Sequence, residues 1–248
     1  MGRDRNDLTA FVTVCASVSG ASHSKSGKPN QDAYAHSPIP QGTAIAVADG
    51  LGSANCGGAG AKLAVEAAVE AAKGGSDVIC AVAEARSALE SAADQGLAIR
   101  DFACTLIVCI ATEESVEIAH MGDGGVVGVY DESIELLSDP GDAEYADETD
   151  PLSARDWLRR LRHSVHPAPS GPLALFTDGC QRAALRRKGG WKAHPGFFIP
   201  LFEFVTSNVR GAATGLEELL VGEKMSEHSD DDKTLAVAIP MGRTEGER

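Results

Sequence analysis

The sequence has no run of 18 apolar residues, no amino-terminal hydrophobic segment of the signal-peptide type and no lipidation motif. Since nothing in it directs the chain to a membrane, we expect a cytoplasmic protein. Basic residues are scarce as well: 22 Lys and Arg stand against 36 Asp and Glu, which gives a formal net charge of −14. Binding to nucleic acids or anionic membranes requires basic patches, so we expect neither as a partner.

Common enzyme motifs are also missing. The six cysteines form no C-x-x-C pair, and several lie in apolar runs, which favours buried free thiols over disulfides or zinc ligands. The segment around Lys62 is not a P-loop, because Leu63 stands where a Ser or Thr is needed. G-x-G-x-x-G, G-x-S-x-G and H-E-x-x-H do not occur, which disfavours dinucleotide binding, serine hydrolases and zinc proteases.

The length and composition permit one domain with a sizeable core. The chain has 248 residues, 43% of them apolar, and contains no internal repeat. We expect a single domain over residues 8–240, with flexible termini at 1–7 and 241–248. An alternating pattern predicts a strand at residues 11–19, and a continuous apolar run predicts one at 43–49. Further strands are predicted at residues 102–111, 116–121, 126–130, 134–137, 173–177 and 235–239. Helical patterns lie at residues 57–73, 77–93, 157–161, 181–188, 197–205 and 211–221.

These elements do not alternate regularly. The strands cluster and the helices come in pairs, so the pattern favours an α+β layered sandwich over repeated βαβ units. Residues 20–29 are small, polar and basic, which predicts a loop. Residues 138–150 are acidic and poor in apolar side chains, which predicts an exposed segment.

Carboxylates stand at the ends of apolar strands. The strand at residues 43–49 ends on Asp49, followed by Gly50, and the strand at 173–177 is followed by Asp178 and a glycine. Three consecutive aspartates, residues 230–232, precede the final strand. Two unit charges 4 Å apart repel by about 4 kcal/mol at an intermediate dielectric, so converging carboxylates need neutralisation. A single Asp-Gly is most often only a turn, but the repeated pattern predicts an oxygen-ligated Mg or Mn site.

Two further patterns concern phosphate. The predicted loop carries His23, Lys25 and Lys28, which could bind a phosphate group or could simply be solvated. Cys180 and Arg186 have the C-x5-R spacing of cysteine phosphatases. The residues between them include no glycine to form a phosphate cradle and look helical, which disfavours this second interpretation.

Five short motifs together resemble metal-dependent protein phosphatases of the 2C type, in the family's order and approximate spacing. They are Asn30-Gln31-Asp32, Val47-Ala48-Asp49-Gly50, Met121-Gly122-Asp123, Phe176-Thr177-Asp178-Gly179 and Asp231-Asp232-Lys233-Thr234. Residues 20–32 and 144–149 are similar to a bacterial branch of that family. The resemblance to this branch implies a signalling role and an association with a Ser/Thr protein kinase or a von Willebrand-type domain protein.

The resemblance implies an α/β/β/α sandwich of two antiparallel sheets flanked by helix pairs. It implies two Mn or Mg ions, bridged by Asp49, with the Gly50 carbonyl on one ion and Asp178 and Asp231 on the other. A metal-activated water would then hydrolyse phosphoserine or phosphothreonine in a phosphoprotein substrate, making Asp49, Asp178 and Asp231 the catalytic set. Asp32 would be a ligand or would support the ligands, and Asp123 would belong to a weak third site.

The chain departs from the family pattern at three positions. Gln31 replaces a glutamate ligand, Gly27 replaces a phosphate-binding arginine, and Arg182 replaces an aspartate that would help to hold a third ion. The first two changes favour an alternative, a pseudophosphatase that binds a phosphoprotein without turnover. Retention of Asp49, Asp178 and Asp231 favours catalysis, because mutually repelling carboxylates have little use in an inactive protein.

Overall fold

The computed structural model describes residues 11–40, 42–93, 96–131, 133–141 and 150–241. The predictions for residues 1–7, for 242–248 of the tail and for the motif at 144–149 lie outside the described residues.

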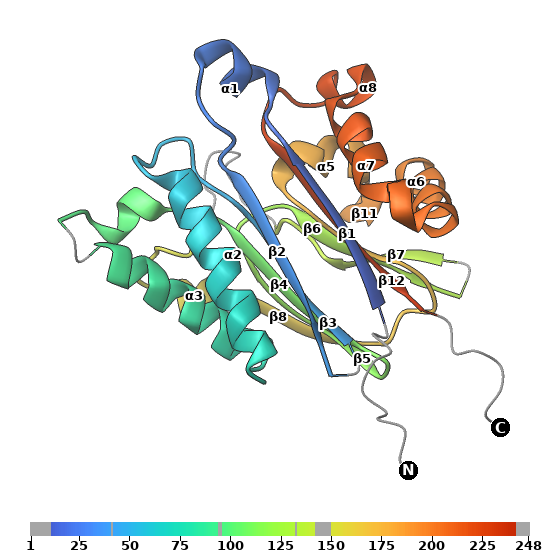
Figure 1. Cartoon of the computed structure of the whole chain (residues 1–248), viewed down its shortest axis with the longest axis horizontal. Helices are drawn as coiled ribbons and strands as arrows, with labels where there is room; N and C mark the ends of the chain where they lie inside the picture. The colour runs from blue at the N-terminus through green and yellow to red at the C-terminus, as the bar shows by residue number, and fades with distance from the viewer. Residues whose placement is uncertain (1–10, 41, 94–95, 132, 142–149, 242–248) are drawn as a thin grey trace.

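Two five-stranded antiparallel sheets form the centre of the molecule (Figure 1). The first sheet has the order β1 (Phe11–Val18), β12 (Lys233–Pro240), β9 (Leu173–Phe176), β6 (Gly125–Tyr130) and β7 (Ser133–Ser138). The second has the order β2 (Asp32–Ile39), β3 (Gly42–Asp49), β4 (Leu106–Thr112), β5 (Ser115–Met121) and β8 (Arg162–Pro167). A separate hairpin joins β10 (Leu185–Arg187) to β11 (Trp191–Ala193).

Helices cover the outer face of each sheet (Figure 1). The second sheet is covered by α2 (Gly57–Lys73) and α3 (Val78–Ala93), whose buried residues share one core with β3 to β5. The first sheet is covered by α5 (Asp178–Ala184), α6 (Pro195–Ser207), α7 (Ala212–Val221) and α8 (Glu223–Ser226). Short helices lie at α1 (Ala21–Ser26), α4 (Trp157–Arg160), η1 (Ile99–Phe102) and η2 (Val209–Gly211). The predicted α/β/β/α sandwich is therefore confirmed.

A third core fills the space between the two sheets. Its buried side chains include Cys15 from β1, Ile45 from β3, Ile107 from β4 and Leu175 from β9. Strands β3, β9 and β12 are buried along nearly their whole length, because one face of each meets the other sheet and the opposite face meets helices. This double burial explains why these strands read as continuous apolar runs rather than as alternating patterns.

Three predictions of local structure need correction. Residues 20–29 are not simply a loop, because Ala21–Ser26 form helix α1; none of its residues is buried, so no apolar face marks it in the sequence. The helix predicted at 181–188 begins at Asp178 and ends at Ala184, and the following residues pair with β11 instead. Strand β8 was not predicted; it is an edge strand with no buried residue.

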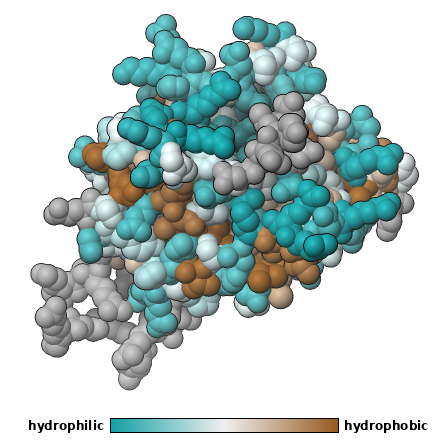
Figure 2. All heavy atoms as spheres, turned by 180° about the vertical axis from the view of Figure 1, so that it is seen from behind, coloured by the Kyte–Doolittle hydropathy of each residue, from teal (hydrophilic) through white to brown (hydrophobic). Residues whose placement is uncertain are grey.

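The cysteines behave as the sequence predicts. All six are free thiols, and Cys15, Cys104, Cys109 and Cys180 are buried. In the part of the chain that the structure describes, no helix combines the length and the apolar character needed to cross a bilayer. The face in Figure 2 is covered largely by hydrophilic side chains, with separate groups of apolar residues between them.

Candidate active site

The acidic strand ends predicted from the sequence meet at one edge of the sandwich. Asp32, the first residue of β2, is the register partner of Asp49, the last residue of β3. Asp178 follows β9, and the next residue, Gly179, packs directly on the start of β12: a Cβ atom there would lie 1.9 Å from the carbonyl oxygen of Asp232. The glycine is therefore required by this close approach.

The backbone of Asp49 is fixed on both sides. Its N–H donates to Thr105 Oγ1 at 2.9 Å, and the Thr105 N–H donates back to the Asp49 carbonyl at 2.8 Å. A Cβ atom on Gly50 would lie 2.3 Å from the carbonyl carbon of Gly57, the first residue of α2. The Asp-Gly pair at this strand end thus places a carboxylate beside a tightly packed helix start.

Threonine 177 links the two sheets beside these carboxylates. Its hydroxyl donates to Asp32 Oδ2 at 2.6 Å and accepts from the Thr234 N–H at 3.0 Å. Asn30 adds a second link, because its side-chain amide donates to Ser17 Oγ at 2.8 Å and its Oδ1 accepts from the Asp32 N–H at 3.0 Å. Thr177 was not predicted as a site residue, although it stands directly before Asp178 in the sequence.

Burial and mutual repulsion raise the pKa values of three aspartates. Burial, followed by the neighbouring charge of Asp32, raises the pKa of Asp49 to about 9. Burial and the charge of Asp49 raise the pKa of Asp178 to about 8. Burial, opposed by the hydrogen bond from Thr177, raises the pKa of Asp32 to about 7. The charges of Asp123 and Asp231 also raise the pKa values of Asp49 and Asp178.

The oxygen atoms at this edge fit a hard divalent cation. Gln31 Oε1, Asp32 Oδ1 and Asp178 Oδ1 are buried and accept no hydrogen bond from the described residues. Buried polar atoms are normally satisfied, and Mg or Mn prefers such carboxylate and amide oxygens. Among the described residues, no three His, Cys, Asp or Glu side chains already converge into a complete ligand set. The chemistry of the donor atoms therefore fits a hard divalent cation.

Asp232 is a buried residue that was not predicted to belong to the site. Its side chain is 1% exposed; Oδ1 accepts from the Gly20 N–H at 2.8 Å, and Oδ2 accepts from the Gln31 N–H at 2.6 Å. His23 Nδ1 lies 2.7 Å from the same Oδ2. Asp231, by contrast, is exposed, and its Oδ1 accepts the Asp232 N–H at 2.9 Å. The triplet in the sequence could not show which carboxylate turns inward.

The candidate phosphate-binding residues separate in the structure. Asp32, Asp49 and Asp178 form the carboxylate cluster. His23 turns toward the buried Asp232, at the margin of this cluster. Lys25 and Lys28 are exposed, and their side chains make no hydrogen bond or ion pair with another described residue. Of the three, only His23 is connected to the cluster by a contact.

Asp123 lies in a turn whose backbone carbonyls accept hydrogen bonds from His120 and Arg162. His120 Nε2 donates to the Asp123 carbonyl at 3.0 Å, and Ser138 Oγ lies 2.7 Å from His120 Nδ1. Arg162 donates to the carbonyl oxygen of Gly122 in the same turn. Burial, and next the charge of Arg162, lowers the pKa of His120 to about 3. His120 is thus a neutral residue that supports the turn.

The environment of Cys180 disfavours a cysteine nucleophile. Its thiol is fully buried, and burial raises its pKa above the ordinary range. Its Sγ donates to the Thr234 carbonyl at 3.7 Å. The Arg186 guanidinium donates to the carbonyls of Arg182 and Leu185 rather than approaching the thiol. A thiolate is the reactive form, so this cysteine is inert.

Comparison with known proteins gives matches over most of the chain. A family described as Protein phosphatase 2C matches residues 19–221. Serine/threonine-protein phosphatase 3 of Escherichia coli strain K12 is 34% identical, with 91% of this chain and 97% of that protein covered.

Solved structures with the same fold have lower sequence identity. The catalytic domain of serine threonine protein phosphatase PstP, solved in complex with two manganese ions, is 15% identical with a TM-score of 0.66, covering 92% of this chain and 97% of that one. Serine/threonine phosphatase Stp1 from Staphylococcus aureus is 14% identical with a TM-score of 0.64, covering 98% of this chain and 100% of that one. At these identities the likeness shows the fold alone.

Proposed function

Because the chain belongs to the protein phosphatase 2C family, we propose that it removes phosphate from phosphoserine and phosphothreonine in protein substrates, using two Mn or Mg ions. The enzyme class predicted from the sequence, a protein phosphatase, agrees with this membership. The observation that carries the proposal is that Asp32 and Asp49 are register partners at the strand ends, Thr177 beside Asp178 donates to Asp32, and Asp32 Oδ1, Asp178 Oδ1 and Gln31 Oε1 are buried without a hydrogen-bond partner among the described residues.

We assign the residues as follows. Asp49 would help to hold both ions, the Gly50 carbonyl would be a ligand of one of them, and Asp178 and Asp231 would be ligands of the other. When bound, the ions supply Lewis acidity and lower the pKa of the water that attacks phosphorus. Asp32, held by Thr177 at 2.6 Å, is a ligand or supports the ligands, and Gln31 offers its amide oxygen. Asp123 belongs to a weak third position.

The substrate phosphate needs cationic or hydrogen-bonding groups near the cluster. We assign this role to His23, Lys25 and Lys28. His23 is held by Asp232 at 2.7 Å, which fixes its ring, whereas the two exposed lysines keep their side-chain entropy until a substrate engages them. A protein of net charge −14 gains from such local positive groups when it receives an anionic substrate.

The alternative of a pseudophosphatase has no support in the comparisons. We also propose that the protein works in the cytoplasm, in signalling, with a Ser/Thr protein kinase or a von Willebrand-type domain protein as a partner. These last assignments follow from the resemblance to the bacterial branch.

The test is phosphate release from a phosphothreonine peptide with and without added Mn. We expect activity that requires Mn or Mg and disappears with a chelator. The matched control is Cys180→Ser, which removes the only thiol in the C-x5-R pattern and should leave activity intact. Activity that survives chelation but is lost in Cys180→Ser would contradict the proposal.

A further inference from the structure

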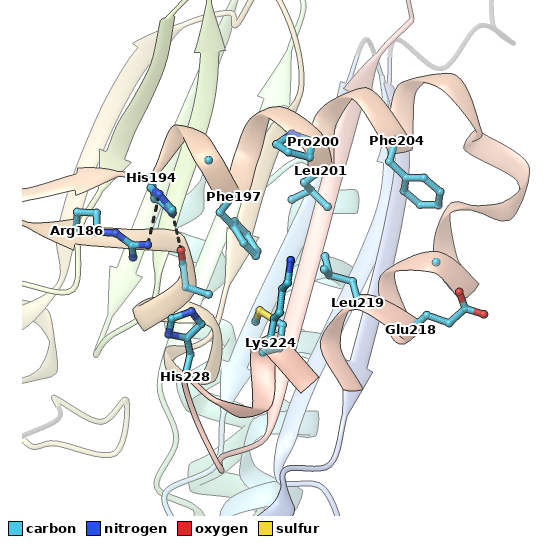
Figure 3. A pocket seen from close by; sticks show the side chains of 14 residues that line it. Arg186, His194, Phe197, Pro200, Leu201, Phe204, Glu218, Leu219, Lys224 and His228 are labelled. Atoms are coloured by element: carbon cyan, nitrogen blue, oxygen red, sulfur yellow. Dashed lines mark hydrogen bonds between the residues drawn. The ribbon is translucent and has the colours of Figure 1, made fainter. Parts of the chain in front are cut away.

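A cavity of about 690 Å³ lies between helices α5, α6, α7 and α8 (Figure 3). None of the residues that line it is a candidate metal ligand, so it is a separate place from the carboxylate cluster. Its volume lies within the range of about 300–1,000 Å³ that is typical of small-molecule sites. Nothing in the proposed phosphatase chemistry uses it.

The body of the cavity is apolar. Its walls include Phe197, Leu201 and Phe204 from α6, Leu219 from α7 and Met225 from α8. Phe204 and Leu219 are each 37% exposed, although both are large apolar side chains. A ligand that covered them would remove apolar surface from water, which is favourable by about 25 cal/mol per Å².

Cationic and imidazole groups gather at one end of the cavity in Figure 3, where Arg186, His194 and His228 are drawn. The Arg186 guanidinium is held in place, because its Nη1 donates to the carbonyls of Arg182 and Leu185 and its Nη2 lies 3.4 Å from His194 Nε2. His194 Nδ1 in turn lies 3.2 Å from the Ala183 carbonyl. The guanidinium is thus oriented without any carboxylate partner among the described residues.

A second cation lies along the cavity. The Lys224 side chain extends from α8 between Phe197 and Leu219 in Figure 3, and it has no ion-pair partner in the described part of the chain. The one carboxylate in the lining, Glu218, lies at the opposite end from Arg186 in that view. In a chain with a net charge of −14, two cations without carboxylate partners beside an apolar cavity form a locally polarised site.

We propose that this cavity binds an amphipathic organic anion, whose carboxylate pairs with Lys224 on the side of the cavity toward Arg186 and whose alkyl or aromatic body packs on Phe197, Leu201, Phe204 and Leu219. The cationic side chains favour a carboxylate head group, because hydrogen bonds between charged groups are stronger than those between neutral groups. The apolar side chains of α6, α7 and α8 favour an alkyl or aromatic group for the rest of the ligand. The volume of the cavity, which four helices border, fits a small molecule.

The experiment is calorimetric titration of the metal-free protein with octanoate, compared with octylammonium, which has the same chain length and the opposite charge. The net negative charge of the protein would favour octylammonium in any non-specific binding. Preference for octanoate would therefore report the cationic end of the cavity. We expect saturable octanoate binding at one site and no saturable binding of octylammonium.

Three variants locate the site. Lys224→Glu and Phe204→Ser change an exposed cation and a partly exposed apolar side chain, and each should weaken octanoate binding by roughly tenfold or more. Lys62→Glu is the matched control, because it makes the same charge change at an exposed position on α2, in the opposite helix layer. Melting temperatures check that all three variants fold.

Octanoate should also bind to Asp49→Asn, because Asp49 does not line the cavity. This variant therefore tests the cavity independently of the proposed phosphatase mechanism. The inference is overturned if octanoate does not bind, if octylammonium binds equally well, or if Lys62→Glu weakens binding as much as Lys224→Glu does.

Discussion

His23 and Asp232 are separated by 209 residues in the chain, yet His23 Nδ1 lies 2.7 Å from Asp232 Oδ2. The same carboxylate accepts the backbone N–H groups of Gly20 and Gln31. One buried side chain thus connects the start of β12 with both ends of the segment that carries α1. The position of that segment beside the carboxylate cluster depends on this residue.

Asp232→Asn should therefore destabilise the protein. An amide has one acceptor oxygen, so one of the two backbone donors would face an N–H₂ group and lose its partner. The expected loss in the free energy of unfolding is about 1–3 kcal/mol, measured by urea denaturation. His23→Ala removes only the side-chain contact and should cost less. In the double variant the two effects should not add, because Asp232→Asn weakens the contact that His23→Ala removes. Full additivity would show that the His23 contact contributes nothing.

Asp49→Asn and Asp178→Asn should each abolish nearly all turnover while the protein remains folded. Each change deletes a charge that the cations need but alters little volume. Their raised pKa values show that the carboxylates are costly to bury, so the metal-free melting temperature at pH 8 should hold or rise. Phosphate release and thermal unfolding measure the two effects. A large fall in metal-free stability in both variants would assign these aspartates a structural role instead.

The stability of the metal-free protein should fall as the pH rises from 6 to 9. Folded pKa values of about 7, 8 and 9 for Asp32, Asp178 and Asp49 lie above the unfolded values, so the folded state holds more protons across this window. Their contribution to stability is complete below the unfolded pKa and is lost as the pH passes through the folded pKa. Melting curves at several pH values test this, and the slope should be smaller in Asp49→Asn. Stability that rose with pH would contradict it.

Gln31→Glu should lower the Mn concentration that gives half-maximal activity. Gln31 Oε1 is buried without a hydrogen-bond partner among the described residues, and a carboxylate would replace its dipole with a full charge. The expected gain is on the order of tenfold, about 1.4 kcal/mol. Calorimetric Mn binding gives a second readout that does not depend on turnover.

The opposing result is also informative. If Asp32 already fills the coordination position, the added carboxylate would only increase repulsion with Asp32 and Asp49. An unchanged or weaker Mn requirement in Gln31→Glu would remove Gln31 from the metal shell. Gln31→Leu, which retains bulk without an oxygen, serves as the control, because it should weaken Mn binding only if the amide oxygen is a ligand.

The sequence by itself determined the local features of this protein. The apolar runs ending on Asp49 and Asp178 predicted buried strands with carboxylates at their ends, and the period of 3.6 in residues 57–73 predicted α2. Such patterns can be read because the burial of a strand or helix face repeats every few residues. The five motifs, in their order along the chain, were sufficient to predict the family and, from the family, the sandwich fold.

Only the tertiary structure decided which of these pieces touch. Strand β12 pairs with β1 and β9, so that Val237 is the register partner of Val14, near the other end of the chain, and of Ala174. Directly before this strand, Asp232 is buried and Asp231 is exposed. The raised pKa values of Asp32, Asp49 and Asp178, and the cavity bordered by α5 to α8, also result from contacts between distant segments. Desolvation, repulsion and enclosure depend on distances between segments far apart in the sequence, and no local pattern encodes those distances.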